Sequence, residues 1–180
     1  MWRSILFIKA ALALASPTMT DGLQAQYAEI LQRESVKRGL DPVELVALVE
    51  NESHWDASRV GGVGQHCIGL GQHCLHTLAV CRDTAYRGDL CQAEWDALLV
   101  GEYNLRATAA LVSEKIAACS RRTRRPVTFR RWVTSYQGFG SRCGMVHTRR
   151  GWVDGPMRAQ TAKIVARAAE FVRIVGARKP

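Results

Sequence analysis

Six cysteines constrain the fold of this chain more than any other feature of its 180 residues. Four of them fall within residues 67–91, and the other two follow at wider spacing; the set is Cys67, Cys74, Cys81, Cys91, Cys119 and Cys143. An even number of cysteines in an exported chain is typical of a disulfide framework, although the pairing cannot be read from the sequence. We therefore expect three disulfides and a stapled loop region over residues 67–91.

The first residues are typical of an export signal. A short basic start at residues 1–3 precedes an apolar run over 4–15, which is interrupted by Lys9 and ends in a small-x-small cleavage site. The run is shorter than the roughly 20 apolar residues that span a bilayer, so we expect no transmembrane span. We predict a signal peptide over 1–15, with cleavage up to about residue 25 as an option, and a periplasmic or secreted protein. A docked first helix or an uncleaved anchor is the alternative.

Hydrophobic periodicity predicts an all-α fold, or α+β at most, with a small hairpin within 58–72. The composition, 47% hydrophobic and 23% charged, is that of one globular domain, which we place at residues 25–175. Asp41 is a good N-cap, Glu44 has capping-box spacing, and Gly39 is a helix stop. Loops with short helical turns are expected over 56–91 and a Gly-rich turn over 137–144. Helices are expected over 24–38, 41–53, 92–119, 129–136 and 156–175.

Helix phase singles out Glu52 as a candidate acid. It continues the stripe formed by Leu45, Leu48 and Val49, whereas Glu50 points to the opposite side and should be solvated. Partial burial and the negative end of the helix dipole both favour a protonated carboxyl, which cleavage of a glycosidic bond requires. The alternative is a structural glutamate paired with a backbone group or an arginine.

Two short strings downstream add to this candidate. The glycines of Ile68-Gly69-Leu70-Gly71-Gln72 can bring backbone close to a ligand, and Gln72 can donate and accept hydrogen bonds to sugar hydroxyls. Tyr136, in Tyr136-Gln137-Gly138, can bond the Glu52 carboxyl or stack on a sugar. The plainer alternatives are an ordinary turn and a core tyrosine.

The order Glu52-Ser53, Gly69-Leu70-Gly71-Gln72, an Asn in a long helix and Tyr136-Gln137-Gly138 resembles the soluble lytic transglycosylase family. This resemblance implies a lysozyme-like single domain with a sugar-binding cleft. It implies that Glu52 is the catalytic acid and base, acting on peptidoglycan without a cofactor. It also implies substrate-binding positions, which are Ser53, Gly69, Leu70, Gln72, Asn104 and Tyr136.

The implied reaction cuts the β-1,4 bond between N-acetylmuramic acid and N-acetylglucosamine and leaves a 1,6-anhydro end. A lysozyme-type muramidase would need a second carboxylate, for which Asp56, Asp83 and Glu102 are candidates without motif support. A catalytically silent wall-binding protein is a further alternative.

Charge and histidine content suggest other partners. The formal net charge is +9, with a basic run at Arg121, Arg122, Arg124 and Arg125 that we expect to attract anionic wall polymers or a membrane surface. We find no nucleic-acid-binding module and do not expect nucleic acid as a partner. The Cys/His cluster of residues 66–81 is an alternative zinc site, but it lacks a CxxC pair, so we expect no metal. We expect a monomer.

Overall fold

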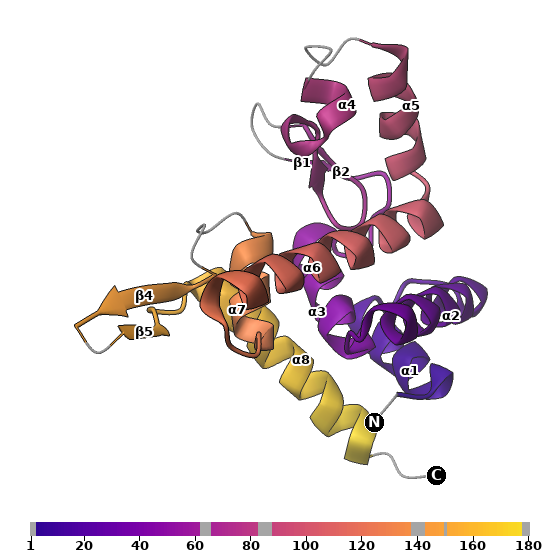
Figure 1. Ribbon diagram of the computed structural model, residues 1–180. Helices are drawn as coiled ribbons and strands as arrows, with labels where there is room; N and C mark the ends of the chain where they lie inside the picture. Colours follow the sequence, from indigo (N-terminus) through magenta and orange to yellow (C-terminus); the bar gives the residue numbers. More distant parts are fainter. Residues whose placement is uncertain (1–2, 62–65, 83–87, 138–142, 150, 178–180) are drawn as a thin grey trace.

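The computed structural model describes residues 3–61, 66–82, 88–137, 143–149 and 151–177. These residues are mostly helical and include two small antiparallel sheets, which confirms the predicted fold class at the level of α+β (Figure 1). Among them, no helix combines the length and the apolar character needed to cross a membrane. The α-helices are α1 (Ile5–Ala15), α2 (Asp21–Arg38), α3 (Pro42–Ser53), α4 (Ala79–Arg82), α5 (Asp89–Leu98), α6 (Gly101–Thr123), α7 (Phe129–Tyr136) and α8 (Ala159–Ala177). The strands are β1 (Val60–Gly61), β2 (Cys67–Ile68), β3 (His73–Cys74), β4 (Met145–Thr148) and β5 (Gly151–Asp154), and a 3-10 helix, η1, spans Leu75–Thr77.

The first helix is part of the main core. In α1, Ile8 and Leu12 are fully buried against α2, α3 and α8. Lys9, which interrupts the apolar run, forms an ion pair with Asp21 at an Nζ–Oδ1 distance of 2.6 Å. The backbone oxygen of Leu14 accepts a hydrogen bond from α8. This arrangement is the docked first helix of the sequence alternative, and cleavage within residues 1–25 stays a prediction.

The predicted helix ends are mostly confirmed in α2 and α3. Gly39 ends α2 with a left-handed φ of 70°, and the Asp41 carboxylate accepts a hydrogen bond from the Val43 amide at 2.9 Å. The capping box is wrong, because Glu44 turns away from the helix start and accepts a hydrogen bond from the Trp132 indole at 3.3 Å. Tertiary packing against α7 therefore overrides the local capping spacing.

The single helix expected over 92–119 is two helices, α5 and α6. They break at residues 99–100 because they belong to different cores: Leu98 packs with Ile68 in a small upper core, whereas Leu105 packs in the main core. At the start of α6, a Cβ on Gly101 would lie 2.0 Å from the Tyr27 hydroxyl oxygen. The close approach of α2 thus leaves no room for a side chain at the first residue of α6.

The upper part of the molecule in Figure 1 is the stapled region that the cysteines predict. Strand β2 pairs antiparallel with both β1 and β3, and the hairpin expected within 58–72 is this three-stranded sheet. Two disulfides, Cys67–Cys74 and Cys81–Cys91, close loops within it. The third, Cys119–Cys143, joins the end of α6 to the segment before β4. All six cysteines are therefore paired, as expected.

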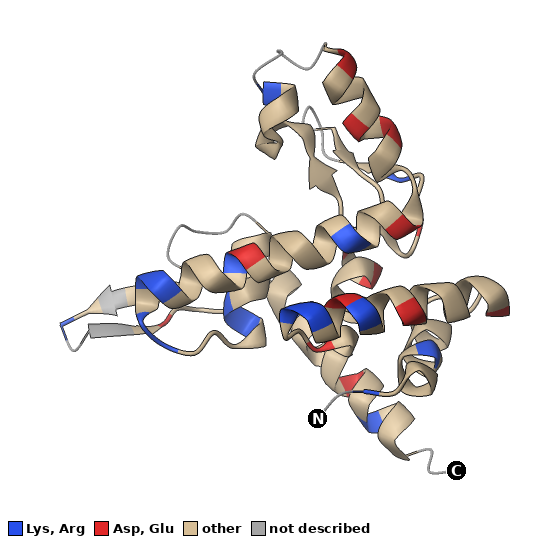
Figure 2. Ribbon diagram, turned by 45° about the vertical axis from the view of Figure 1, so that its right-hand side comes forward, with Lys and Arg blue, Asp and Glu red and all other residues tan. Residues whose placement is uncertain are grey.

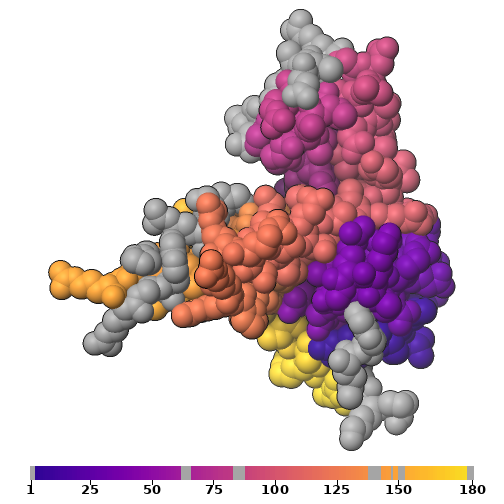
Figure 3. Space-filling view, in the orientation of Figure 1, coloured from indigo at the N-terminus to yellow at the C-terminus, as the bar shows by residue number. Residues whose placement is uncertain are grey.

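The strands β4 and β5 were not expected from the sequence. They form a two-stranded hairpin with Val146 opposite Val153, and α8 begins at Ala159 rather than at residue 156. The hairpin extends away from the helical body, at the end of the molecule opposite α2 (Figures 1 and 3).

Candidate functional site

Glu52 lies in the last turn of α3, where the predicted helix phase is confirmed. Leu45, Leu48 and Val49 are buried, and Glu52 is half-buried. The fully buried Ser53 donates a hydrogen bond to the Val49 carbonyl and accepts one from the Trp55 amide, each at 3.2 Å. The chain then leaves the helix through two left-handed residues, one of which is Trp55 with a φ of 66°. Ser53 therefore fixes the turn that follows the carboxyl.

Burial raises the pKa of Glu52, and the amides of Gln137 and Asn51 and the charge of Arg59 lower it in part. The C-terminal end of a helix also disfavours a negative charge. The Oε1 atom is shielded from solvent and has no hydrogen-bond partner in the described part of the chain, and the same holds for Gln137 Nε2 and Asn51 Nδ2. Both amides lie close enough to influence the carboxyl but are not bonded to Oε1. Glu52 is thus a carboxyl of raised pKa whose Oε1 has no partner among the described residues.

The orientation of the Gln137 amide is set by α8. Its Oε1 accepts a hydrogen bond from the fully buried Thr161 at 3.0 Å, which leaves the Nε2 group to face Glu52. Thr161 therefore positions Gln137 relative to the carboxyl.

The glycine-rich loop is shaped by its close approach to α6. Gly69 has a φ of 71°, and a Cβ there would lie 2.2 Å from Asn104 Nδ2. A Cβ on Gly71 would lie 2.0 Å from Thr108 Oγ1. Since both positions exclude a side chain, the two glycines serve the contact between the loop and the helix.

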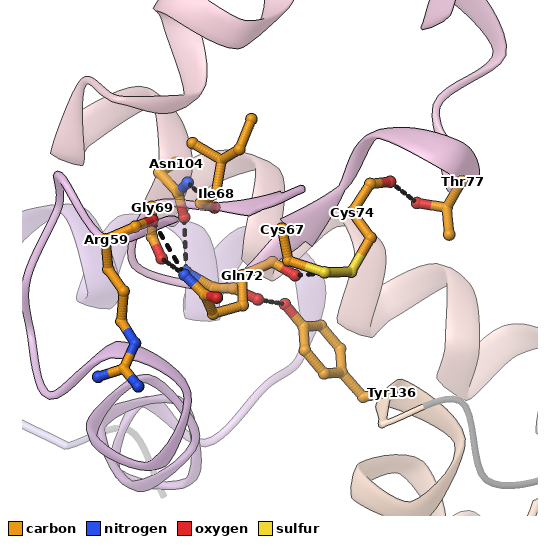
Figure 4. Close-up of a disulfide and its surroundings, with 10 residues drawn as sticks. Arg59, Cys67, Ile68, Gly69, Gln72, Cys74, Thr77, Asn104 and Tyr136 are labelled. Atoms are coloured by element: carbon orange, nitrogen blue, oxygen red, sulfur yellow. Dashed lines mark hydrogen bonds between the residues drawn. A yellow bond between two sulfur atoms is a disulfide. The ribbon is translucent and has the colours of Figure 1, made fainter. Parts of the chain in front are cut away.

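Asn104 is the centre of this contact (Figure 4). Its Oδ1 accepts a hydrogen bond from the Gly71 amide at 2.7 Å, and its Nδ2 donates to the carbonyls of Leu98 at 2.8 Å and Ile68 at 3.3 Å. Its side chain is fully buried. Asn104 therefore ties the Gly-rich loop, the end of α5 and α6 together from the inside.

Gln72 also forms hydrogen bonds at the Gly-rich loop. With a left-handed φ of 51°, it directs Nε2 to the carbonyls of Arg59 at 3.1 Å and Gly69 at 2.9 Å (Figure 4). The amide nitrogen of Gln72 therefore joins the loop to the segment between α3 and β1.

Tyr136 connects the loop to the acid. Its hydroxyl donates a hydrogen bond to the Gly71 carbonyl at 2.7 Å (Figure 4). Burial and the nearby charge of Glu52 raise the pKa of Tyr136 far above its usual range. The tyrosine is thus a neutral donor between the Gly-rich loop and the carboxyl.

The structure accordingly brings Glu52, Tyr136 and the Gly69–Gln72 loop into one cluster. Within it, Ser53, Leu70 and Asn104 have no exposed surface and act as positioning residues. Gly138 of the motif lies outside the described residues, and no feature of the described residues identifies the predicted sugar-binding cleft. The cleft therefore stays a prediction.

Four residues of this cluster were not predicted as site residues, although Gln137 stands in the quoted motif and His73 in the Cys/His cluster; the four are Asn51, His73, Thr108 and Gln137. Thr108 lies one helical turn after Asn104, which is a spacing that could have found it. Its Oγ1 lies 3.0 Å from His73 Nε2 and 3.3 Å from Asn104 Oδ1, to which it donates, so the His73 ring donates to Thr108. Burial lowers the pKa of His73 to about 4, so this histidine is neutral.

Glu50 is not solvated, contrary to the expectation. Its carboxylate accepts hydrogen bonds from Arg167 of α8, with Nε–Oε2 and Nη2–Oε1 distances of 2.8 Å each. This pair borders a pocket of about 410 Å³ between α3 and α8. The ion pair holds one face of α3 against α8, and Glu52 lies on a different face of the same helix.

The Cys/His cluster considered as a zinc site is arranged differently. Cys67, Cys74 and Cys81 are in disulfides, which removes their thiolates as ligands, and His73 is bonded to Thr108.

Comparison with known proteins gives no match, either to protein-family models or to curated protein sequences. The functional assignment therefore rests on the motif resemblance and on the geometry around Glu52.

Proposed function

We propose that this chain is a peptidoglycan lytic transglycosylase with Glu52 as its only acid and base. The observation that carries the proposal is a half-buried carboxyl of raised pKa whose buried oxygen has no partner among the described residues. A structural glutamate in the interior is normally hydrogen-bonded or ion-paired, as Glu50 is here. An unpaired protonated acid fits transfer of a proton to a glycosidic oxygen.

In the proposed reaction Glu52 gives its proton to the oxygen between N-acetylmuramic acid and N-acetylglucosamine as the bond from C1 to that oxygen breaks. The Glu52 carboxylate then removes the proton of the muramic acid C6 hydroxyl, whose oxygen bonds to C1. The products are a free 4-hydroxyl and a 1,6-anhydro end, and Glu52 is protonated again. The amides of Asn51 and Gln137 lie where they can stabilise the carboxylate between the two steps.

A muramidase with a second carboxylate is less well supported. Retaining and inverting hydrolases place the partner roughly 5–9.5 Å from the acid. Asp56 is exposed and accepts hydrogen bonds from Ser58, and Glu102 is ion-paired with Arg106. Glu44 lies eight residues before Glu52 on α3, which is about 12 Å along a helix axis. Asp83 lies outside the described residues.

The compartment is part of the proposal. Three disulfides support an oxidising location, which is periplasmic or secreted. The four arginines at the end of α6, Arg121, Arg122, Arg124 and Arg125, are exposed, which supports attraction to anionic material of the cell envelope.

The decisive experiment digests purified peptidoglycan and identifies the new ends by mass spectrometry, since an anhydro end differs from a reducing end by one water. The wild type should release anhydro-muropeptides, Glu52→Gln should release none, and Glu29→Gln, at an exposed position on α2, should match the wild type. Reducing ends would identify a hydrolase instead. Wall binding by a wild type that releases nothing would identify the silent binder, and full activity of Glu52→Gln would refute the assignment.

A further inference from the structure

The β4–β5 hairpin buries Met145 but exposes two apolar side chains on its other face. Its two strands pair with each other, and the cross-strand partners Val146 and Val153 are 39% and 41% exposed. Directly opposed residues on antiparallel strands have their side chains on one face, so the two valines form a single apolar patch. The space-filling view shows the hairpin extending beyond the helical body (Figure 3).

This exposed hairpin is firmly held at its base. A two-stranded hairpin alone is marginally stable in water, so these fastenings are what keep it formed. The Cys119–Cys143 disulfide holds the chain just before β4, and the Gly155 amide donates to the Gly144 carbonyl at 2.8 Å. Arg131 of α7 donates to the Asp154 carboxylate at 2.8 Å. The structure thus presents the valines on a fixed support.

Basic side chains lie on the end of α6, which the disulfide joins to the hairpin, and at the hairpin turn. Arg121, Arg122 and Arg124 are exposed at the end of α6, next to the disulfide, and Arg149 is exposed at the turn of the hairpin. Figure 2 shows basic segments at the end of α6, in α7 and at the far end of the hairpin. The hydrogen bond and the charge of Arg131 lower the pKa of Asp154, so this carboxylate stays ionised, and its ion pair with Arg131 offsets its negative charge. The region therefore combines positive charge with an apolar patch.

We propose that this hairpin surface, made of Val146, Val153, Arg121, Arg122 and Arg124, docks onto the surface of an anionic phospholipid membrane. Arginines gain from lipid phosphates, and small apolar side chains gain from entering the boundary between headgroups and acyl chains. A soluble anionic polymer would interact favourably with the arginines alone and would leave the two valines exposed to water. Such docking would determine where in the cell envelope the protein is located, and it is independent of the proposed transglycosylase reaction.

The charge arm of the test uses sedimentation with vesicles of pure phosphatidylcholine and of equal parts phosphatidylcholine and phosphatidylglycerol. The full chain should bind the mixed vesicles and bind the neutral ones weakly. The double variant Arg121→Gln, Arg122→Gln should weaken binding by about 25-fold, because one basic residue near such a surface contributes about fivefold. The matched double variant Lys37→Gln, Arg173→Gln removes the same charge from exposed positions on α2 and α8 and should change binding little.

The apolar arm uses Val146→Ser with Val153→Ser, which should weaken vesicle binding and leave binding to the soluble polyanion heparin unchanged. Val146→Phe should strengthen vesicle binding, a gain that misfolding would not produce. Unfolding midpoints confirm that each variant is folded. Equal binding to both vesicle types, equal loss in the matched control, or no effect of the valine changes would overturn the proposal. Self-association that the valine changes abolish would also overturn it, in favour of an interface between copies.

Discussion

Glu44 gives the sharpest test of the electrostatics of α3. Burial and the charge of Asp41 raise its pKa from an ordinary 4.5 to about 7, against smaller opposing effects of the Trp132 hydrogen bond and Arg3. This rise corresponds to about 3 kcal/mol of preference for the protonated form in the folded state. We therefore expect that replacing Glu44 by glutamine, which keeps the carbonyl acceptor for Trp132, stabilises the protein at alkaline pH.

The sign follows from proton linkage. Below about pH 4.5 the carboxyl is protonated in both the folded and the unfolded chain, so it contributes no pH dependence there. Between about pH 4.5 and pH 7 the folded chain holds the proton that the unfolded chain has lost, so the free energy of unfolding falls as pH rises. Above about pH 7 the loss is complete, and it reaches about 3 kcal/mol.

The assay is denaturant unfolding of the wild type, Glu44→Gln and the exposed control Glu29→Gln at several values between about pH 4 and pH 8.5. The difference between Glu44→Gln and the wild type should grow from near zero at the acid end to about 3 kcal/mol at the alkaline end. The Glu29→Gln difference should stay flat. A Glu44→Gln curve parallel to the wild type would refute the argument that burial holds the Glu44 proton.

Three further changes test the loop and the hairpin by the same unfolding measurement. Asn104→Ala should cost about 3 kcal/mol or more, because it leaves the Gly71 amide and the Leu98 carbonyl without their buried partner; a loss below about 1 kcal/mol would contradict this role. Gly69→Ala should destabilise the protein by more than about 1 kcal/mol, because Gly69 has a positive φ and a Cβ there would lie 2.2 Å from Asn104 Nδ2. The control Gly22→Ala in α2 should stabilise the protein slightly, because a Cβ there would have no atom within 4 Å. Replacing Cys119 and Cys143 by serine should cost about 3 kcal/mol and make the hairpin amides exchange faster in hydrogen exchange; unchanged exchange would show that the disulfide does not hold the hairpin.

The features of the fold that depend on residues close together in the sequence are predicted correctly. The Asp41 cap, the Gly39 stop and the apolar phase of α3 up to Glu52 are set by residues within a few positions of each other, and the structure confirms them. The disulfide pairing could not be predicted from the sequence, because it depends on contacts between distant segments, as between Cys119 and Cys143.

The missed features depend on contacts between distant segments. Glu50 has the phase of a solvated residue, but Arg167, which lies 117 positions later, covers that face of α3. Residues 145–154 show little alternation of apolar and polar residues, and the hairpin forms because α6 and α7 fasten its base. The break between α5 and α6 likewise reflects two separate cores rather than a helix-breaking sequence.

The two half-buried acids of α3, Glu44 and Glu52, show why a raised pKa alone does not identify a catalytic group. Burial is the main cause of the rise for both Glu44 and Glu52. Glu44, however, is bonded to the Trp132 indole, so its protonation state is tied to the packing of α7 against α3. Glu52, by contrast, has an oxygen with no partner among the described residues, near two amide nitrogens that also lack one and a tyrosine bonded to the Gly-rich loop. This unused hydrogen-bonding capacity, rather than the pKa, is the reason we propose that Glu52 exchanges a proton with a substrate.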